Sequence, residues 1–204
     1  MTNYLHKGDL PDGLAMGPVV AVDSETMGLI PQRDPLCVVQ LSAGDGDAHI
    51  VQLDRTSYRA PRLKALLADP SVVKLFHFAR FDIAAFKYWL GVDTSPVYCT
   101  KIASRLSRTY TDRHGLKDVT RELLGIEMSK QQQSSDWGAE TLTEAQLEYA
   151  ASDVLHLHAL KEKLSAMLAR EGRAELAQAC FDFLPARAEI DLAGWPDVDI
   201  FAHS

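Results

Sequence analysis

Two carboxylates lie one residue apart at the end of a run of small apolar residues. The segment AVDSETMGL carries them as Asp23 and Glu25. If the run is a strand, the alternation of side chains puts both carboxylates on the same face. Their charges repel, and a divalent cation such as Mg²⁺ or Mn²⁺ removes that repulsion because it prefers oxygen ligands. About one Asp-x-Glu arises by chance in a chain of this length, so a turn with two solvated acids is the alternative.

Two further acids lie near predicted helices. Asp82 occurs in HFARFDIAAF, close to the junction of a strand and a helix, where the helix dipole alone would favour an acid. Asp153 occurs in YAASDVLHL, one helical turn after Tyr149. An acid beside the core-facing stripe of a helix is costly unless it has a partner. Together, four acids and a tyrosine are stronger evidence for a functional site than any one of them alone.

The elements that must position these residues alternate between strands and helices. PVVAVD, LCVVQLSA and AHIVQL predict three strands in a β-meander, with GDGD as the turn between the last two. APRLKALL predicts a helix, VVKLFHF a fourth strand, and RFDIAAFKYWLG a helix that ends at Gly91. A short strand is expected near residues 97–99, followed by mostly helical structure. Thr143 and Gln146 form a capping box, and we expect that helix to run to Gly172.

Length and composition predict one domain over residues 1–204. The chain has a net charge of −7, so it lacks the overall basic character of proteins that grip long nucleic acids. No apolar stretch approaches the roughly 20 residues of a membrane span, and the N-terminal residues do not resemble a signal peptide. Cys37, Cys99 and Cys180 fit reduced, buried thiols. We therefore expect a cytoplasmic protein with no membrane partner.

Several phrases of the sequence resemble the RNase D-like family of 3′→5′ exonucleases, the group with four acids and a tyrosine called DEDDy. They are CTKIASRL, HGLKDVTRELLG and SSDWGAETLTEAQLEYAASDVLHLHAL. The resemblance covers roughly residues 18–170 and implies an α/β fold, an RNase H-like mixed β-sheet flanked by helices, with a helical tail over residues 171–204. Family members usually carry His-Asn where this chain has His77-Phe78, which leaves the substrate contacts at that position open.

The resemblance also implies a mechanism with two divalent metal ions, Mg²⁺ or Mn²⁺. Asp23 would bridge the ions, Glu25 and Asp153 would complete the first site, and Asp82 would hold the second ion partly through water. Tyr149 would orient the attacking water, because a phenol with a pKa of about 10 is a poor base near neutrality. The product would be a 5′-nucleoside monophosphate released from a 3′ end.

Seven further residues are candidates for contacts with the substrate. Leu29 is a candidate wedge between terminal bases, with a core leucine as the alternative, and His77 is either a substrate contact or a packing histidine. Phosphate contacts are expected from a set of polar residues that could equally be surface positions: Lys101, Arg105, Lys130, Gln133 and Ser135. The short chain and the KQQQSSDW segment resemble compact relatives that degrade RNA dinucleotides and form ring-shaped octamers.

Three other functions stay open. A broader RNase D-like enzyme would trim the 3′ ends of structured RNA, although the residues after 170 are too few for a second helical domain. A catalytically silent nucleic-acid-binding scaffold would keep the fold without the reaction. A phosphatase with Asp23 as nucleophile would need no metal. Short RNA is the expected partner, together with other copies of the chain, and DNA stays open as a second substrate.

Overall fold

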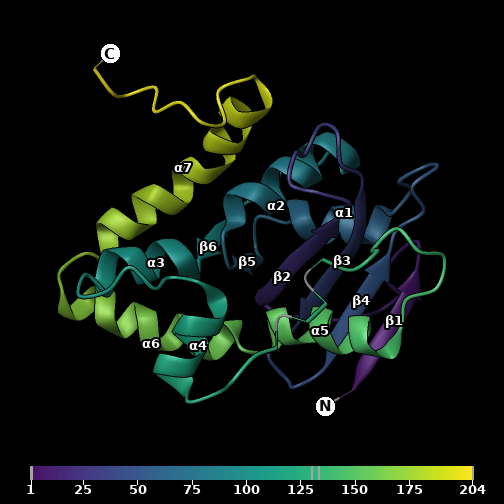
Figure 1. Ribbon diagram of the computed structural model, residues 1–204, viewed down its shortest axis with the longest axis horizontal. Helices are drawn as coiled ribbons and strands as arrows, with labels where there is room; N and C mark the ends of the chain where they lie inside the picture. The colour runs from purple at the N-terminus through teal and green to yellow at the C-terminus, as the bar shows by residue number, and fades with distance from the viewer. Residues whose placement is uncertain (1, 130, 133, 204) are drawn as a thin grey trace.

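The fold is built on a six-stranded mixed sheet in the order β1-β4-β3-β2-β5-β6 (Figure 1). The structure is a computed structural model that describes residues 2–129, 131–132 and 134–203. β2 and β3 are antiparallel, as are β3 and β4, whereas the outer pairs are parallel. In chain order the strands are β1 (Asn3–Lys7), β2 (Val19–Thr26), β3 (Leu36–Ser42), β4 (Ala48–Gln52), β5 (Val73–Phe76) and β6 (Val97–Cys99).

Helices flank the sheet and carry most of the second half of the chain. α5 lies across the strands β1 to β4, whereas α7 packs against α2, α3 and β6. In chain order the helices are α1 (Pro61–Ala68), α2 (Ala79–Ala85), the π-helical η1 (Phe86–Leu90), α3 (Thr100–Ser107), α4 (Leu116–Leu124), α5 (Glu144–Leu155), α6 (Leu157–Arg170) and α7 (Ala174–Leu192).

The predicted β-meander is confirmed, and its middle strand lies at the centre of the core. Every residue of β3 is buried, which is the continuous pattern expected of a strand covered on both faces. The predicted helix after the fourth expected strand divides into α2 and η1 and ends at Gly91, whose φ of 66° suits glycine. The buried apolar side chains of sheet and helices form one contiguous cluster.

Two expectations about secondary structure were wrong or incomplete. The helix predicted from Thr143 to Gly172 is two helices, because the chain breaks at His156 (φ −102°, ψ −6°). α5 packs on the sheet while α6 packs on α3 and α4, so the two apolar stripes face different partners. β1 was missed because it is an edge strand without fully buried residues, and its apolar pattern is correspondingly weak.

The remaining general expectations concern the cysteines, the tail and the membrane. Cys37 and Cys99 are buried free thiols and Cys180 is partly exposed. The tail after α7 contacts its own chain, since the Arg80 guanidinium binds both the Asp191 carboxylate and the Pro196 carbonyl. Within the described part of the chain, no helix combines the length and apolar character that a membrane crossing requires.

Candidate active site

β2 delivers the first two acids to the floor of a cleft. Asp23 and Glu25 point to the same side of the strand, as their spacing predicts. On the neighbouring strand β3, Gln40 is opposite Asp23, and its Nε2 donates to Asp23 Oδ2 at 2.6 Å. Because Gln40 is fully buried, this hydrogen bond fixes one carboxylate oxygen of Asp23.

Asp82 lies close enough to Asp23 for its pKa to be raised by the charge of Asp23, but it is not among the three carboxylates whose ligand atoms lie within 4.8 Å of one another. It lies in the first turn of α2, which follows β5, the parallel neighbour of β2. Its Oδ1 accepts a hydrogen bond of 2.6 Å from Ser24 Oγ, and both side chains are buried. Ser24, the residue between the two acids of β2, therefore holds the Asp82 side chain close to the strand that carries Asp23 and Glu25.

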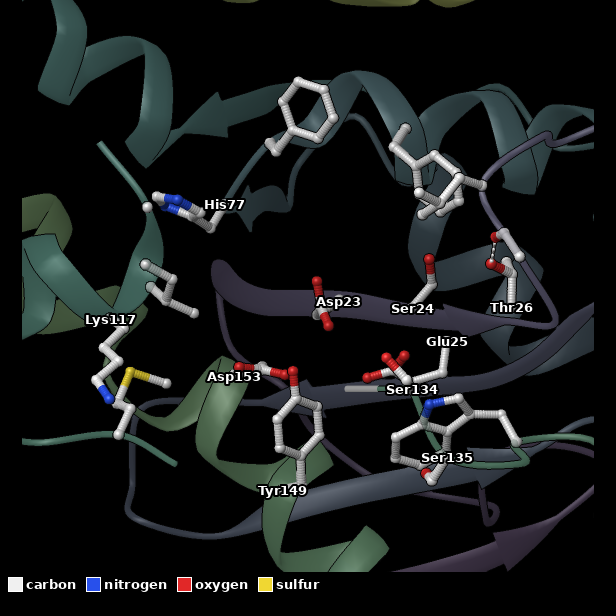
Figure 2. Close-up of a pocket in the computed structure, with 18 of the residues that line it drawn as sticks. Asp23, Ser24, Glu25, Thr26, His77, Lys117, Ser134, Ser135, Tyr149 and Asp153 are labelled. Atoms are coloured by element: carbon white, nitrogen blue, oxygen red, sulfur yellow. Dashed lines mark hydrogen bonds between the residues drawn. The ribbon is translucent and has the colours of Figure 1, made fainter. Parts of the chain in front are cut away.

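α5 supplies the last two members of the constellation. Its capping box is present as predicted, with Thr143 Oγ1 accepting from the Gln146 backbone N–H. One ligand oxygen each from Asp23, Glu25 and Asp153 lies within 4.8 Å of the other two. Figure 2 shows these three carboxylates facing one another, with Tyr149 beside Asp153. Residues from β2 and α5 that are far apart in sequence thus form one acidic cluster.

The cluster is electrostatically unfavourable without a cation. Burial raises the pKa of Asp23, and the hydrogen bonds from the Ser24 backbone and Gln40 only partly oppose this. Burial raises the pKa of Glu25 as well, and the neighbouring acids raise it further. Burial followed by the charge of Asp23 also raises the pKa values of Asp82 and Asp153. A bound cation would reverse this penalty, since opposite charge favours the ionised carboxylates.

Tyr149 can act as a hydrogen-bond donor at the cleft rather than as a base. Its phenol lines the cleft, and burial, followed by the charges of Asp153, Glu25 and Asp23, raises its pKa above the usual value of 10. The phenol is therefore protonated at neutral pH and can donate a hydrogen bond. That Tyr149 orients the attacking water stays a prediction.

The acidic cluster opens into a cleft of about 700 Å³. Of the residues expected to contact substrate, Leu29, His77, Lys101 and Ser135 line this cleft. Leu29 is 84% exposed, so the alternative of a core leucine is wrong. Arg105 is exposed on α3 and is not among the described lining residues. Lys130 and Gln133 fall outside the residues that the structure describes.

His77 is anchored at one nitrogen. Its Nδ1 lies 2.9 Å from Thr100 Oγ1, and Thr100 in turn donates to the Phe76 carbonyl. Burial, with a smaller effect from the charge of Lys101, lowers the pKa of His77 to about 3. The ring is therefore neutral at physiological pH. Its Nε2 is buried and has no hydrogen-bond partner among the described residues, and the neutral ring does not contribute positive charge.

Several lining residues were not predicted from sequence. Phe78, Lys117 and Trp137 are three of them, and Figure 2 shows Lys117 near His77, on the side of the cleft opposite Ser134 and Ser135. Trp137 is 3% exposed, and its indole Nε1 has no hydrogen-bond partner among the described residues. The phrases HGLKD and SSDWG contained Lys117 and Trp137, but nothing in the sequence alone showed that they meet one cleft.

The loop that carries Ser135 and Trp137 is fastened through its backbone carbonyls. Arg55 Nη2 donates to the Gly138 carbonyl at 2.7 Å, while Nη1 of the same guanidinium lies 3.1 Å from Met27 Sδ. Gln52 Nε2 donates to the Ala139 carbonyl at 2.8 Å. Arg55 therefore contacts both this loop and the segment that follows Glu25. The two segments lie on the same cleft and are held together by this one side chain.

A family model described as 3′–5′ exonuclease matches residues 9–169. The chain is a member of the 3′–5′ exonuclease family. The sequence-based prediction of an RNase D-like exonuclease with a mixed sheet of the RNase H-like type is thereby confirmed. The matched range contains all four acids and the tyrosine.

The relatives of this exonuclease differ in the share of their own length that the chain covers. Ribonuclease D of Acidiphilium cryptum is 37% identical over 164 residues, which is 80% of this chain and 41% of the relative. The chain thus spans about two fifths of that curated relative. Two solved structures of Brucella melitensis NrnC, one bound to pGG and one with bound Mg²⁺, match over 100% of both chains. Their identities are 56% and 55% and their TM-scores 0.97 and 0.96. Escherichia coli RNase D is 27% identical with a TM-score of 0.73, covering 84% of this chain and 45% of that one.

Proposed function

We propose that this exonuclease is a metal-dependent 3′–5′ exoribonuclease that hydrolyses RNA dinucleotides and short oligonucleotides to 5′-nucleoside monophosphates. The observation that carries the proposal is the acidic cluster at the floor of the cleft, where three carboxylates offer ligand atoms within 4.8 Å of one another. The full-length similarity to NrnC, which has been solved with pGG, supports a short substrate.

The residues present fit divalent cations. All donors of the cluster are carboxylate oxygens, the ligands that Mg²⁺ and Mn²⁺ prefer, and the NrnC structure with Mg²⁺ supports the same metal. Asp23, Glu25 and Asp153 would hold one ion, and Asp82, near Asp23, would take part in holding a second. Two such ions stabilise the attacking and the leaving oxygen of an in-line displacement at phosphorus.

The chain's own groups orient the reaction. Tyr149 would donate a hydrogen bond to the attacking water, and Gln40 keeps Asp23 in place. Water adds to the phosphorus of the last phosphodiester, the bond from phosphorus to the 3′ oxygen breaks, and that oxygen leaves with a proton. The products are a 5′-monophosphate and an RNA shortened by one nucleotide, which for a dinucleotide is a second mononucleotide. The lining residues Lys101 and Lys117 supply positive charge for the phosphates.

The test compares substrates of different length. We expect Mg²⁺- or Mn²⁺-dependent turnover of a 5′-phosphorylated dinucleotide to exceed that of a heptamer, and EDTA to abolish both. Equal rates, or a faster heptamer, would favour the second candidate, an enzyme that trims structured RNA. Activity that resists EDTA would favour a covalent aspartyl phosphatase, and no activity at all would favour a silent scaffold.

We further propose that residues 1–204 act as one exonuclease domain that assembles into a homo-oligomer, an octamer by resemblance. Exposed apolar side chains after α7 support this, because Val198 and Phe201 are 50% and 75% exposed. Light scattering tests the assembly, and a stable monomer would contradict it. A cytoplasmic location fits three free thiols. Hydrolysis of DNA dinucleotides, compared with RNA in the same assay, decides whether DNA is a second substrate.

A further inference from the structure

One aromatic residue at the cleft has an unusual backbone conformation. Phe78 immediately precedes α2 with φ 76° and ψ 42°, in the left-handed region. Among the described residues it shares a positive φ with one other non-glycine residue, Tyr58. This region is costly for a bulky side chain, and Asn or Gly tolerates it better. Strained residues of this kind persist where the surrounding structure enforces them, and they cluster at functional sites.

Phe78 is also exposed to solvent, which is unfavourable for an apolar ring. Its side chain is 44% exposed and lines the cleft that contains the acidic cluster. Tyr58 differs in this respect, because its hydroxyl donates to the Leu36 carbonyl and its ring packs against Trp89. The strain at Tyr58 therefore accompanies internal packing, whereas the strain at Phe78 accompanies an aromatic ring held at the wall of the cleft.

A lysine occupies one face of the Phe78 ring. The Nζ atom of Lys101 lies 4.1 Å from the ring centroid, a cation–π contact. Lys101 extends from the first turn of α3, which is tied to the end of β5 through Thr100 and the Phe76 carbonyl. The ring is thus supported from one side by a fixed helix, and the exposed remainder of its surface borders the cleft.

We propose that Phe78 is a stacking platform for a nucleobase of the bound oligonucleotide, with Lys101 supporting the ring from its other face. This inference rests on the proposed function and adds a substrate-specificity residue to it. Base–aromatic stacking tolerates any base because every base has a π-face. The platform would therefore bind dinucleotides of any sequence, with a preference for purines because they offer the larger surface.

The test replaces Phe78 with residues that separate strain from stacking. Phe78→Asn suits the left-handed backbone but cannot stack as a phenyl ring does, Phe78→Leu stays apolar but is not aromatic, and Phe78→Tyr keeps the aromatic ring. The matched control is Tyr88→Asn, because Tyr88 is 49% exposed and is not among the described residues of the cleft. Each variant is assayed for Tm and for KM and kcat on 5′-phosphorylated diguanylate and dicytidylate with Mg²⁺.

We expect Phe78→Asn to have an unchanged or higher Tm together with a KM for diguanylate raised by about 5- to 150-fold. Its kcat should stay within about threefold of wild type, and the rise in KM should be smaller for dicytidylate. Phe78→Leu should also raise KM, whereas Phe78→Tyr and Tyr88→Asn should resemble wild type. Opposite effects on stability and on KM separate this role from a structural one.

The failure of this inference is distinguishable from the failure of the proposed function. If wild-type protein neither hydrolyses nor binds the dinucleotides, the proposed function is wrong. If wild type is active and Phe78→Leu keeps its KM, the stacking platform is wrong, whether or not Phe78→Asn folds. A lower Tm in Phe78→Asn with an unchanged KM would assign Phe78 to packing alone.

Discussion

Removing one charge from the acidic cluster should make the metal-free protein more stable while abolishing its activity. Asp153→Asn keeps the shape of the side chain and deletes its charge. The ligand atoms lie within 4.8 Å of one another, and two unit charges at that upper limit repel by about 3.5 kcal/mol at an effective dielectric constant of about 20. The wild-type cluster reduces this cost by binding protons, because burial and mutual repulsion raise the pKa values of its carboxyls. We therefore expect Asp153→Asn to raise the unfolding free energy by about 1–3 kcal/mol in EDTA.

The pH dependence follows from the direction of these pKa shifts. The carboxyls of Asp23 and Glu25 have folded-state pKa values above their unfolded values of 3.8 and 4.5. Their contribution to stability is fully present below the unfolded pKa and is lost as pH rises through the folded pKa. Metal-free wild type should thus lose stability from about pH 4 upward through neutrality. Asp153→Asn should lose less, so the difference between the two proteins should grow with pH.

Thermal unfolding in EDTA and in Mn²⁺ measures both effects. For a domain of this size, about 1–3 kcal/mol corresponds to a Tm higher by about 2–10 °C. Mn²⁺ should raise the Tm of wild type more than that of Asp153→Asn, because only wild type has the full ligand set. Asp112→Asn, at an exposed position, is the control for losing a carboxylate elsewhere. A variant that is less stable than wild type in EDTA at pH 8, or that still hydrolyses dinucleotides, would refute the reasoning.

Three further changes test the elements around the cluster. Thr143→Ala removes the capping box of α5 and should lower the unfolding free energy by about 1 kcal/mol in urea titrations. Thr143→Ser, which keeps a capping hydroxyl, is the control, and equal stability of the two variants would contradict a role for the cap. Tyr149→Phe should lower kcat by less than about 100-fold, which is below the usual effect of losing a general base, and should leave the acid limb of the pH–rate profile in place. Loss of that limb would show that Tyr149 accepts the proton. Arg55→Leu removes the link between Met27 and Gly138 and should raise KM for a dinucleotide about 2- to 10-fold, so an unchanged KM would show that the loop is held without it.

The elements that carry the acids were predictable because their signals are local. The alternation of β2 is enough to place Asp23 and Glu25 on one face, and Thr143 with Gln146 marks the start of α5. Both follow from the geometry of a few consecutive residues. The sequence also contained the family phrases around Asp153, so the class of reaction could be inferred before any distance was known.

Tertiary packing decided what local signals could not. The break at His156 arises because α5 and α6 pack against different partners, and β1 is stabilised by pairing with β4 rather than by an apolar pattern of its own. The positions of Phe78 and Trp137 at the cleft depend on segments far away in sequence that line the same cleft. The sequence by itself determined which residues could do the chemistry, through types and spacings that act over a few residues. Only the folded structure determined which of them meet, because burial and contact depend on the whole chain.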